Sequence, residues 1–94
     1  MREIDLDGTN WKTTDDFYGA FFDAVGSPNW HGRNFNALRD SIARGRINSI
    51  ELPYTIRISG LEKAPLEVRE IVESFHDLIK ELNSKGYKVD ISCR

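Results

Sequence analysis

The two histidines, His31 and His76, are the side chains best suited to acid–base chemistry near neutral pH. Such a pair can serve as general acid and general base on RNA, which makes a small nuclease one hypothesis. Neither histidine stands in a motif with a positioned third group, and the surroundings of Cys93, Ser41 and Ser59 contain no local motif for a nucleophile with a histidine and an acid. The simpler interpretation is that His31 is a surface ring beside Trp30 and that His76 borders the apolar face of a helix.

Motifs of phosphate, nucleotide and metal chemistry are missing from the sequence. It contains no G-x-S-x-G, no G-x-x-x-x-G-K and no G-x-G-x-x-G segment. Asp15 and Asp16 follow two threonines, and the start of a helix explains this cluster, because the macrodipole favours acids there. We therefore expect no metal ion and no cofactor. Cys93 is the single cysteine, which excludes an internal disulfide, and we expect it to be a small core residue of the last strand.

A basic segment offers a different chemistry. Between Asn29 and Ile47 four arginines accompany a single acid, Asp40, so this segment carries +3 while the whole chain carries -2. The four are Arg33, Arg39, Arg44 and Arg46. Trp30 could stack on a base beside them, as aromatic rings do in proteins that hold single-stranded nucleic acid. A small nucleic-acid-binding or RNA-processing domain is therefore an alternative, although Asp40 and Arg44, at i and i+4, could equally pair on a helix surface.

These residues must be positioned by regular elements, and the hydrophobic pattern predicts strands and helices in alternation. Segments that alternate apolar and polar residues, as strands do, are 2–7, 54–59 and 87–92. Helical spacing marks a segment from about Asp15 to Val25, which Gly26 closes, and a long segment that Pro65 begins and Gly86 closes. Because helices separate the strands, parallel pairing through helical crossovers is expected. The predicted fold class is α/β, a small three-stranded parallel sheet packed with helices.

The long helix is the clearest of these elements. Its apolar residues recur at i, i+3, i+4 and i+7. Its outer face carries the acids Glu70, Glu73, Asp77 and Glu81. In the strand that follows, Tyr87, Val89 and Ile91 are predicted to alternate with Lys88, Asp90 and Ser92.

Between the first helix and the second strand, a loop runs without a break into a shorter helix that Gly45 would close. At about 100° per residue, the apolar side of this helix consists of Phe35, Leu38 and Ile42. The opposite side consists of Arg33, Asn36, Asp40 and Arg44. Arg39 falls near the boundary and Ala37 beside the polar side, so this helix is expected to have a core face and a presented face.

Size and composition limit the remaining possibilities. The 94 residues, 39% of them hydrophobic, suffice for one core, so we expect a single domain over 1–94. A net charge of -2 gives no overall field that would collect nucleic acid. No apolar run approaches the roughly 20 residues that span a bilayer, and the first residues lack a signal-peptide pattern. We therefore expect a cytoplasmic protein with no membrane partner.

The loop and the shorter helix resemble the central motif of the barstar family, the intracellular inhibitors of barnase-type ribonucleases. In this chain the motif reads Pro28-x-Trp30-His31-Gly32-x-Asn34-Phe35-x-Ala37-Leu38-x-Asp40, and the order of elements is similar over nearly the whole chain. The resemblance implies a barstar-like fold and a bacterial immunity protein or antitoxin that is not an enzyme. It would block a secreted ribonuclease or related toxin with the loop 28–33 and the helix after it. The partner is then a protein, direct nucleic-acid binding is not expected, and the chain would be a monomer.

The family's contact residues carry over position by position. Asp40 matches the aspartate that enters the ribonuclease active site, and Trp30 matches an aromatic residue that packs on the enzyme. Gly32 matches the loop glycine, and Asp77 falls where the family has an acidic contact on the long helix. The partner-binding residues that the resemblance implies are Trp30, His31, Gly32, Arg33, Asn36, Arg39, Asp40, Arg44 and Asp77.

The chain also departs from the family's pattern. Asn36 stands where barstar has a second helix aspartate, Arg39 stands where it has a tryptophan, and Arg44 and Gly45 replace a glycine and a tryptophan. The surface has lost a carboxylate and gained cations, which implies a cognate toxin with a charge pattern unlike that of barnase. A protein-interaction domain that kept the fold without a ribonuclease partner is a further alternative.

Overall fold

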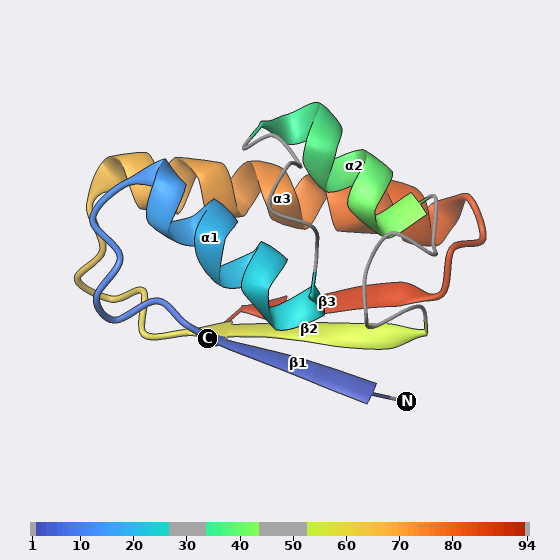
Figure 1. Cartoon of the computed structure of the whole chain (residues 1–94), viewed down its shortest axis with the longest axis horizontal. Coiled ribbons are helices and arrows are strands. Elements are labelled where there is room, and N and C mark those ends of the chain that lie inside the picture. The colour runs from blue at the N-terminus through green and yellow to red at the C-terminus, as the bar shows by residue number, and fades with distance from the viewer. Residues whose placement is uncertain (1, 27–33, 44–52, 94) are drawn as a thin grey trace.

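The computed structural model describes residues 2–26, 34–43 and 53–93. In chain order the elements are β1 (Arg2–Asp7), α1 (Thr14–Val25), α2 (Phe35–Ala43), β2 (Tyr54–Ser59), α3 (Leu66–Ser84) and β3 (Val89–Cys93). The strands form one parallel sheet in the order β1-β2-β3, and the described helices lie on one face of it (Figure 1). The predicted fold class is confirmed. The strand order, which the sequence left open, follows the chain.

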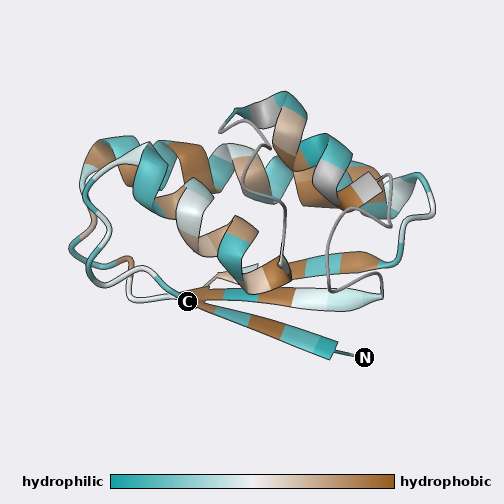
Figure 2. Ribbon diagram, viewed as in Figure 1, coloured by the Kyte–Doolittle hydropathy of each residue, from teal (hydrophilic) through white to brown (hydrophobic). Residues whose placement is uncertain are grey.

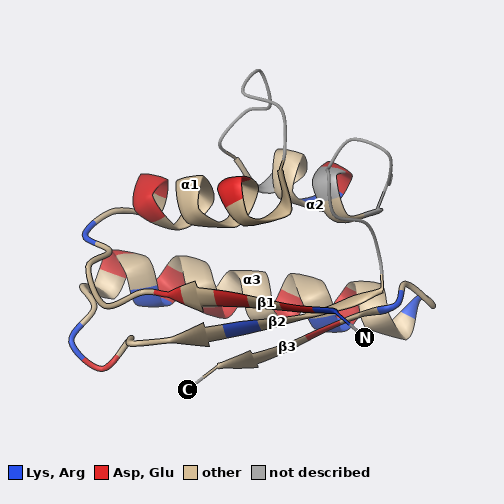
Figure 3. Ribbon diagram, turned by 60° about the horizontal axis from the view of Figure 1, so that its bottom comes forward, with Lys and Arg blue, Asp and Glu red and all other residues tan. Residues whose placement is uncertain are grey.

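The sheet is built from strands that each have one buried and one polar face. Ile4, Ile56 and Ile91 are aligned across the three strands and are buried beneath the helices. Figure 2 shows hydrophobic and hydrophilic residues alternating along β1 and β2. The other face is polar, with acids along β1 (Figure 3), and there Arg57 Nη1 lies 2.8 Å from Glu3 Oε2. Period-two alternation therefore keeps one side of this parallel sheet in water.

The core is centred on Phe75 of α3. Its ring lies 5.1 Å from Phe17 and 5.2 Å from Phe21 of α1, centroid to centroid, with both pairs in edge-to-face geometry. Such pairs add to the stabilisation that comes from burying the rings. Within the described ranges no helix has the length and apolar character needed to cross a lipid bilayer.

Both ends of α1 are fixed by features that the sequence predicts. Thr13 and Asp16 form a capping box, in which the Thr13 side chain accepts from Asp16 N–H and the Asp16 carboxylate accepts from Thr13 N–H. Backbone N–H groups of Lys12 and Thr13 lower the pKa of Asp16, and they account for this acid without a metal ion. Gly26 closes the helix in the left-handed region at φ 70°. The helix begins at Thr14, one residue before its expected start.

The start of α3 differs by one residue from the prediction. Pro65 is the N-cap, with extended backbone angles of φ -60° and ψ 157°, and the helix begins at Leu66. The Pro65 carbonyl accepts from the backbone N–H groups of Val68 and Arg69, so proline still opens the helix but stands outside it. A hydrogen bond joins the starts of α1 and α3, in which Glu67 Oε1 accepts from the Thr14 backbone N–H at 2.8 Å.

The prediction that Tyr87 begins the last strand is wrong. Tyr87 is 37% exposed, and β3 begins only at Val89. The backbone N–H of Tyr87 donates to the Leu82 carbonyl at 3.1 Å, so Tyr87 still belongs to the turn that ends α3. Gly86 allows this turn by adopting φ 98°. The alternation of apolar residues in this strand is real only from Val89 onward.

The prediction that Cys93 is a core residue is also wrong. Cys93 is exposed at the end of β3, although it continues the inward phase of Val89 and Ile91. Its side chain lines an open hollow of about 260 Å³ beside Leu61 and Val72, where the covering side chains do not close over it. Partial burial raises the pKa of its thiol. The alternating pattern predicts the side of the sheet on which the Cys93 side chain lies. It does not predict that the neighbouring side chains leave Cys93 exposed.

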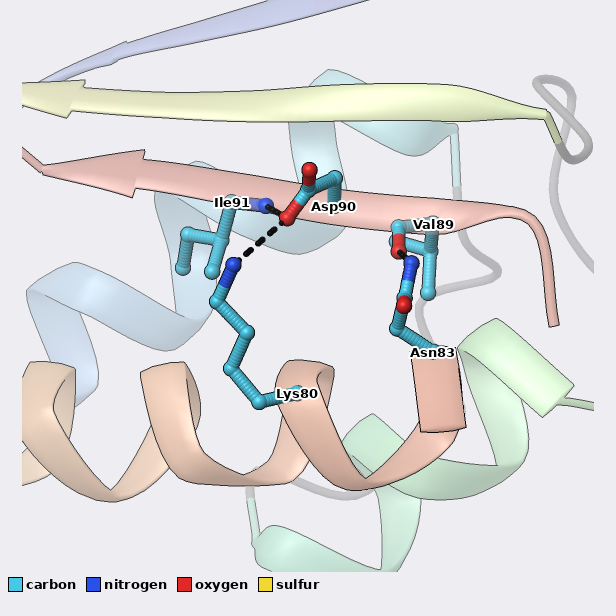
Figure 4. Close-up of polar contacts among 5 residues, drawn as sticks. All are labelled: Lys80, Asn83, Val89, Asp90 and Ile91. Carbon is cyan, nitrogen blue, oxygen red and sulfur yellow. Dashed lines mark hydrogen bonds and ion pairs between the residues drawn. The ribbon is translucent and has the colours of Figure 1, made fainter. Parts of the chain in front are cut away.

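Side chains occupy two backbone groups at the outer edge of β3 (Figure 4). The backbone N–H and C=O groups of successive strand residues point to opposite sides of the strand. The Lys88 carbonyl accepts from the Tyr54 N–H of β2, so the backbone groups of Val89 and Ile91 face away from the sheet. Asn83 Nδ2 donates to the Val89 carbonyl, and Asp90 Oδ1 accepts from Ile91 N–H, each at 2.8 Å. Lys80 Nζ holds the same Asp90 oxygen at 2.8 Å, and this contact lowers the pKa of Asp90.

Tyr54→Phe is expected to increase stability. The Tyr54 ring is 1% exposed, and its hydroxyl has no hydrogen-bond partner among the described residues. Burial raises the pKa of this hydroxyl. An unsatisfied buried polar group costs about 1 to 3 kcal/mol, so removing the oxygen should raise the free energy of unfolding by about 1 kcal/mol in urea denaturation. Tyr18→Phe is the control, because Tyr18 is also buried but its hydroxyl is not a buried group without a partner among the described residues, and a loss of stability in Tyr54→Phe would contradict the prediction.

Candidate functional site

α2 begins with a side-chain cap. Asn34 Oδ1 accepts a hydrogen bond from the Ala37 backbone N–H at 2.9 Å, and the Asn34 carbonyl accepts from Leu38 N–H at 3.1 Å. An N-cap asparagine satisfies a backbone donor that has no partner within the helix. Asn34 belongs to the barstar-like motif, and the structure gives it this structural role. The role is readable from sequence, because asparagine before a periodic apolar segment is a helix-start signal.

α2 has the predicted core face and presented face. Leu38 and Ile42 are almost completely buried, as expected, and Asn36 and Asp40 are exposed on the other side. The side chain of Phe35, the third residue predicted to face the core, lies outside what the structure describes. Ala37 was expected beside the polar side but is buried, because the buried stripe of a surface helix is commonly at least about 100° wide.

An ion pair joins α2 to α3. Arg39 Nη2 lies 2.8 Å from Glu81 Oε2, and the two side chains are 43% and 45% exposed. In Figure 1, α2 lies along the C-terminal half of α3, which is the half that carries Glu81. Arg39 was expected near the boundary of the two faces, and its intermediate exposure confirms this. The sequence placed Glu81 on the outer face of the long helix but could not show that α2 would reach it.

The presented face of α2 and Glu81 of α3 form one surface, and Asp77 extends it along α3. Asp77 is exposed and stands one turn before Glu81, so these two acids share a face of the helix. Of the residues implied by the family resemblance, the structure thus describes Asn36, Arg39 and Asp40 on α2 and Asp77 on α3. The others, Trp30, His31, Gly32, Arg33 and Arg44, lie outside the described residues.

The described residues do not assemble a metal or nucleophilic centre. His76 is half-buried on α3 and lines the hollow that contains Cys93, which confirms its predicted place at the edge of the apolar face. The raised pKa of the Cys93 thiol disfavours the thiolate, the reactive form. No group of three or more histidine, cysteine or acidic side chains within the described ranges could hold a metal ion. Arg39, one of the four arginines of the basic segment, is held by Glu81.

The arrangement suits recognition of a protein by charge. Among the described residues, this surface of α2 and α3 contains Asp40, Asp77 and the paired Arg39 and Glu81, a formal net charge of -2. Exposed carboxylates on a helix can form charge-assisted hydrogen bonds with arginine and lysine side chains of a partner.

Comparison with known protein families identifies the chain. A family model described as Barstar (barnase inhibitor) matches residues 1–94. The chain belongs to the barstar family. Barstar family members are inhibitors rather than enzymes, and their partners are ribonucleases of the barnase kind. The predicted family is thereby confirmed, and a search of curated proteins found no match.

Proposed function

We propose that this member of the barstar family inhibits a barnase-like ribonuclease by placing the loop 28–33 and α2 in the enzyme's active site, with Asp40 as the principal contact. A ribonuclease active site binds RNA phosphate through basic groups. A carboxylate that takes the place of the phosphate forms charge-assisted hydrogen bonds with those groups. The observation that carries the proposal is the exposed position of Asp40 on α2, whose opposite side Leu38 and Ile42 hold in the core.

The neighbours of Asp40 bear on which ribonuclease is inhibited. Asn36 replaces a carboxylate of the family pattern by an amide, which still accepts a hydrogen bond but carries no charge. Arg39 adds a cation, which Glu81 offsets. We therefore propose a cognate enzyme with fewer cations opposite Asn36 than barnase has. By the same proposal the chain acts as a monomeric immunity protein in the cytoplasm of a bacterium that secretes the enzyme.

Inhibition of RNA cleavage tests the proposal directly. Purified chain is titrated into barnase, and separately into any ribonuclease encoded beside its gene, with a fluorogenic RNA substrate at low and moderate salt. The expected result is inhibition that saturates at one chain per enzyme and weakens as salt screens the charges. Undiminished cleavage by both enzymes with a molar excess of chain at low salt would contradict the proposed function.

A further inference from the structure

The ion pair between Arg39 and Glu81 links the proposed inhibitory helix to the longest helix of the fold. Arg39 immediately precedes Asp40, and its guanidinium lies 2.8 Å from the Glu81 carboxylate. Successive helical residues are about 100° apart around the axis. A contact that fixes the direction of residue 39 therefore also restricts the direction of residue 40.

α2 depends on contacts of this kind because it is short. It has nine residues, and a helix of that length is marginal in water by itself. Leu38 and Ile42 anchor one side of it in the core. Arg39 and Glu81 add a polar contact on a different side of the axis, which opposes rotation of the helix about its apolar stripe.

The pair also sets the charge that α2 presents. Without Glu81, the described charges of α2 would be Arg39 and Asp40, which cancel. With Glu81 holding the guanidinium, the positive charge of Arg39 is met within the chain. A cationic enzyme site would repel an arginine without a partner, so this compensation favours a cationic partner.

We propose that Glu81 is a positioning residue of this surface: by holding Arg39 it fixes α2 against α3, so that Asp40 is presented to a cationic active site. The presentation of Asp40 to an enzyme rests on the proposed function. The fixing of α2 against α3 is a property of the isolated chain and can be measured without any enzyme.

The first experiment measures amide hydrogen exchange of α2 in the isolated chain. Glu81→Ala is expected to speed exchange of the α2 amides by about two- to fivefold, the range expected for a half-exposed ion pair. Asp77→Ala is the matched control, because it removes the same charge from the same face of α3 one turn away. Glu3→Ala is a second control, since it breaks the Arg57 ion pair, which has the same length and similar exposure, on the opposite side of the sheet. Neither control should change α2.

A charge swap then distinguishes the effect of the ion pair between Arg39 and Glu81 from the effect of the Glu81 charge by itself. Arg39→Glu combined with Glu81→Arg is expected to bring α2 exchange back toward the wild-type rate, whereas either substitution alone should not. Equal exchange of α2 in Glu81→Ala and wild type would overturn the positioning role. So would an equal acceleration by Asp77→Ala, or a swap that restores nothing.

The second experiment measures binding to barnase. Glu81→Ala is expected to raise the dissociation constant by about tenfold, through both slower association at low salt and faster dissociation, whereas Asp77→Ala should slow association alone. An unchanged dissociation rate in Glu81→Ala would show that Glu81 contributes only charge, and would overturn the role. If the wild-type chain does not bind barnase, the proposed function is contradicted for this enzyme. Whether Glu81 fixes α2 against α3 is then decided by the hydrogen exchange of the isolated chain.

Discussion

Asp40→Ala is expected to weaken inhibition of a barnase-like ribonuclease by at least about a hundredfold, with no loss of fold. Removing one partner of a buried, hydrogen-bonded charge pair leaves the basic groups of the enzyme desolvated without a counter-ion, which is costlier than losing the contact alone. Asp40 is exposed in the isolated chain, so the same substitution removes no core contact. The inhibition constant measured by RNA cleavage and the urea midpoint together check both parts of the expectation.

Asp5→Ala supplies the control for Asp40→Ala. Asp5 is another exposed acid, but it lies on the face of the sheet that the helices do not cover. Its removal changes the net charge by the same amount and should leave inhibition within about twofold, the size of effect expected for a distant screened charge. An Asp40→Ala variant that inhibits as well as the Asp5→Ala variant would exclude Asp40 as the principal contact.

Phe75→Ala is expected to lower the free energy of unfolding by about 3 to 5 kcal/mol, the range for truncating a buried phenylalanine. The ring is completely buried and contacts both Phe17 and Phe21, so its removal leaves a cavity between α1 and α3. The free energy of unfolding of native proteins is about 5 to 15 kcal/mol, so this loss is a large share of the total. Urea denaturation followed by circular dichroism measures it.

Leu66→Ala is the matched control on the same helix. Leu66 is 71% exposed at the start of α3, so its truncation removes little packing and should change stability by no more than about 0.5 kcal/mol. If Phe75→Ala destabilised the chain no more than Leu66→Ala does, the aromatic contacts would not be the centre of the core.

Most of the fold is predictable because its signals are local. Alternation in 54–59, capping at Thr13 and helical spacing after Pro65 each depend on near neighbours, and the structure places all of these elements within one or two residues of the prediction. The errors at Tyr87 and Cys93 are of another kind. Their apolar character continues a strand pattern, but a helix-ending turn takes up Tyr87 and the covering side chains do not close over Cys93.

Less of the candidate site could be predicted, because its geometry depends on contacts between distant segments. The division of α2 into a buried and an exposed face follows from helical periodicity alone, and Asp40 lies on the exposed face as predicted. The partner of Arg39 does not follow from any local pattern. Glu81 is 42 positions away, and only the packing of α2 along α3 brings the two side chains together.

The side chains at the outer edge of β3 affect how the chain behaves at high protein concentration. An open strand edge is a template on which a strand of another molecule can add, and repeated addition leads to aggregates. Here a new strand would first have to displace Asn83 from Val89 and Asp90 from Ile91. At the other edge, β1 of a second copy would bring the acids of the two strands together, and they would repel. Both edges of the sheet thus oppose growth by strand addition, one by occupied backbone groups and the other by charge.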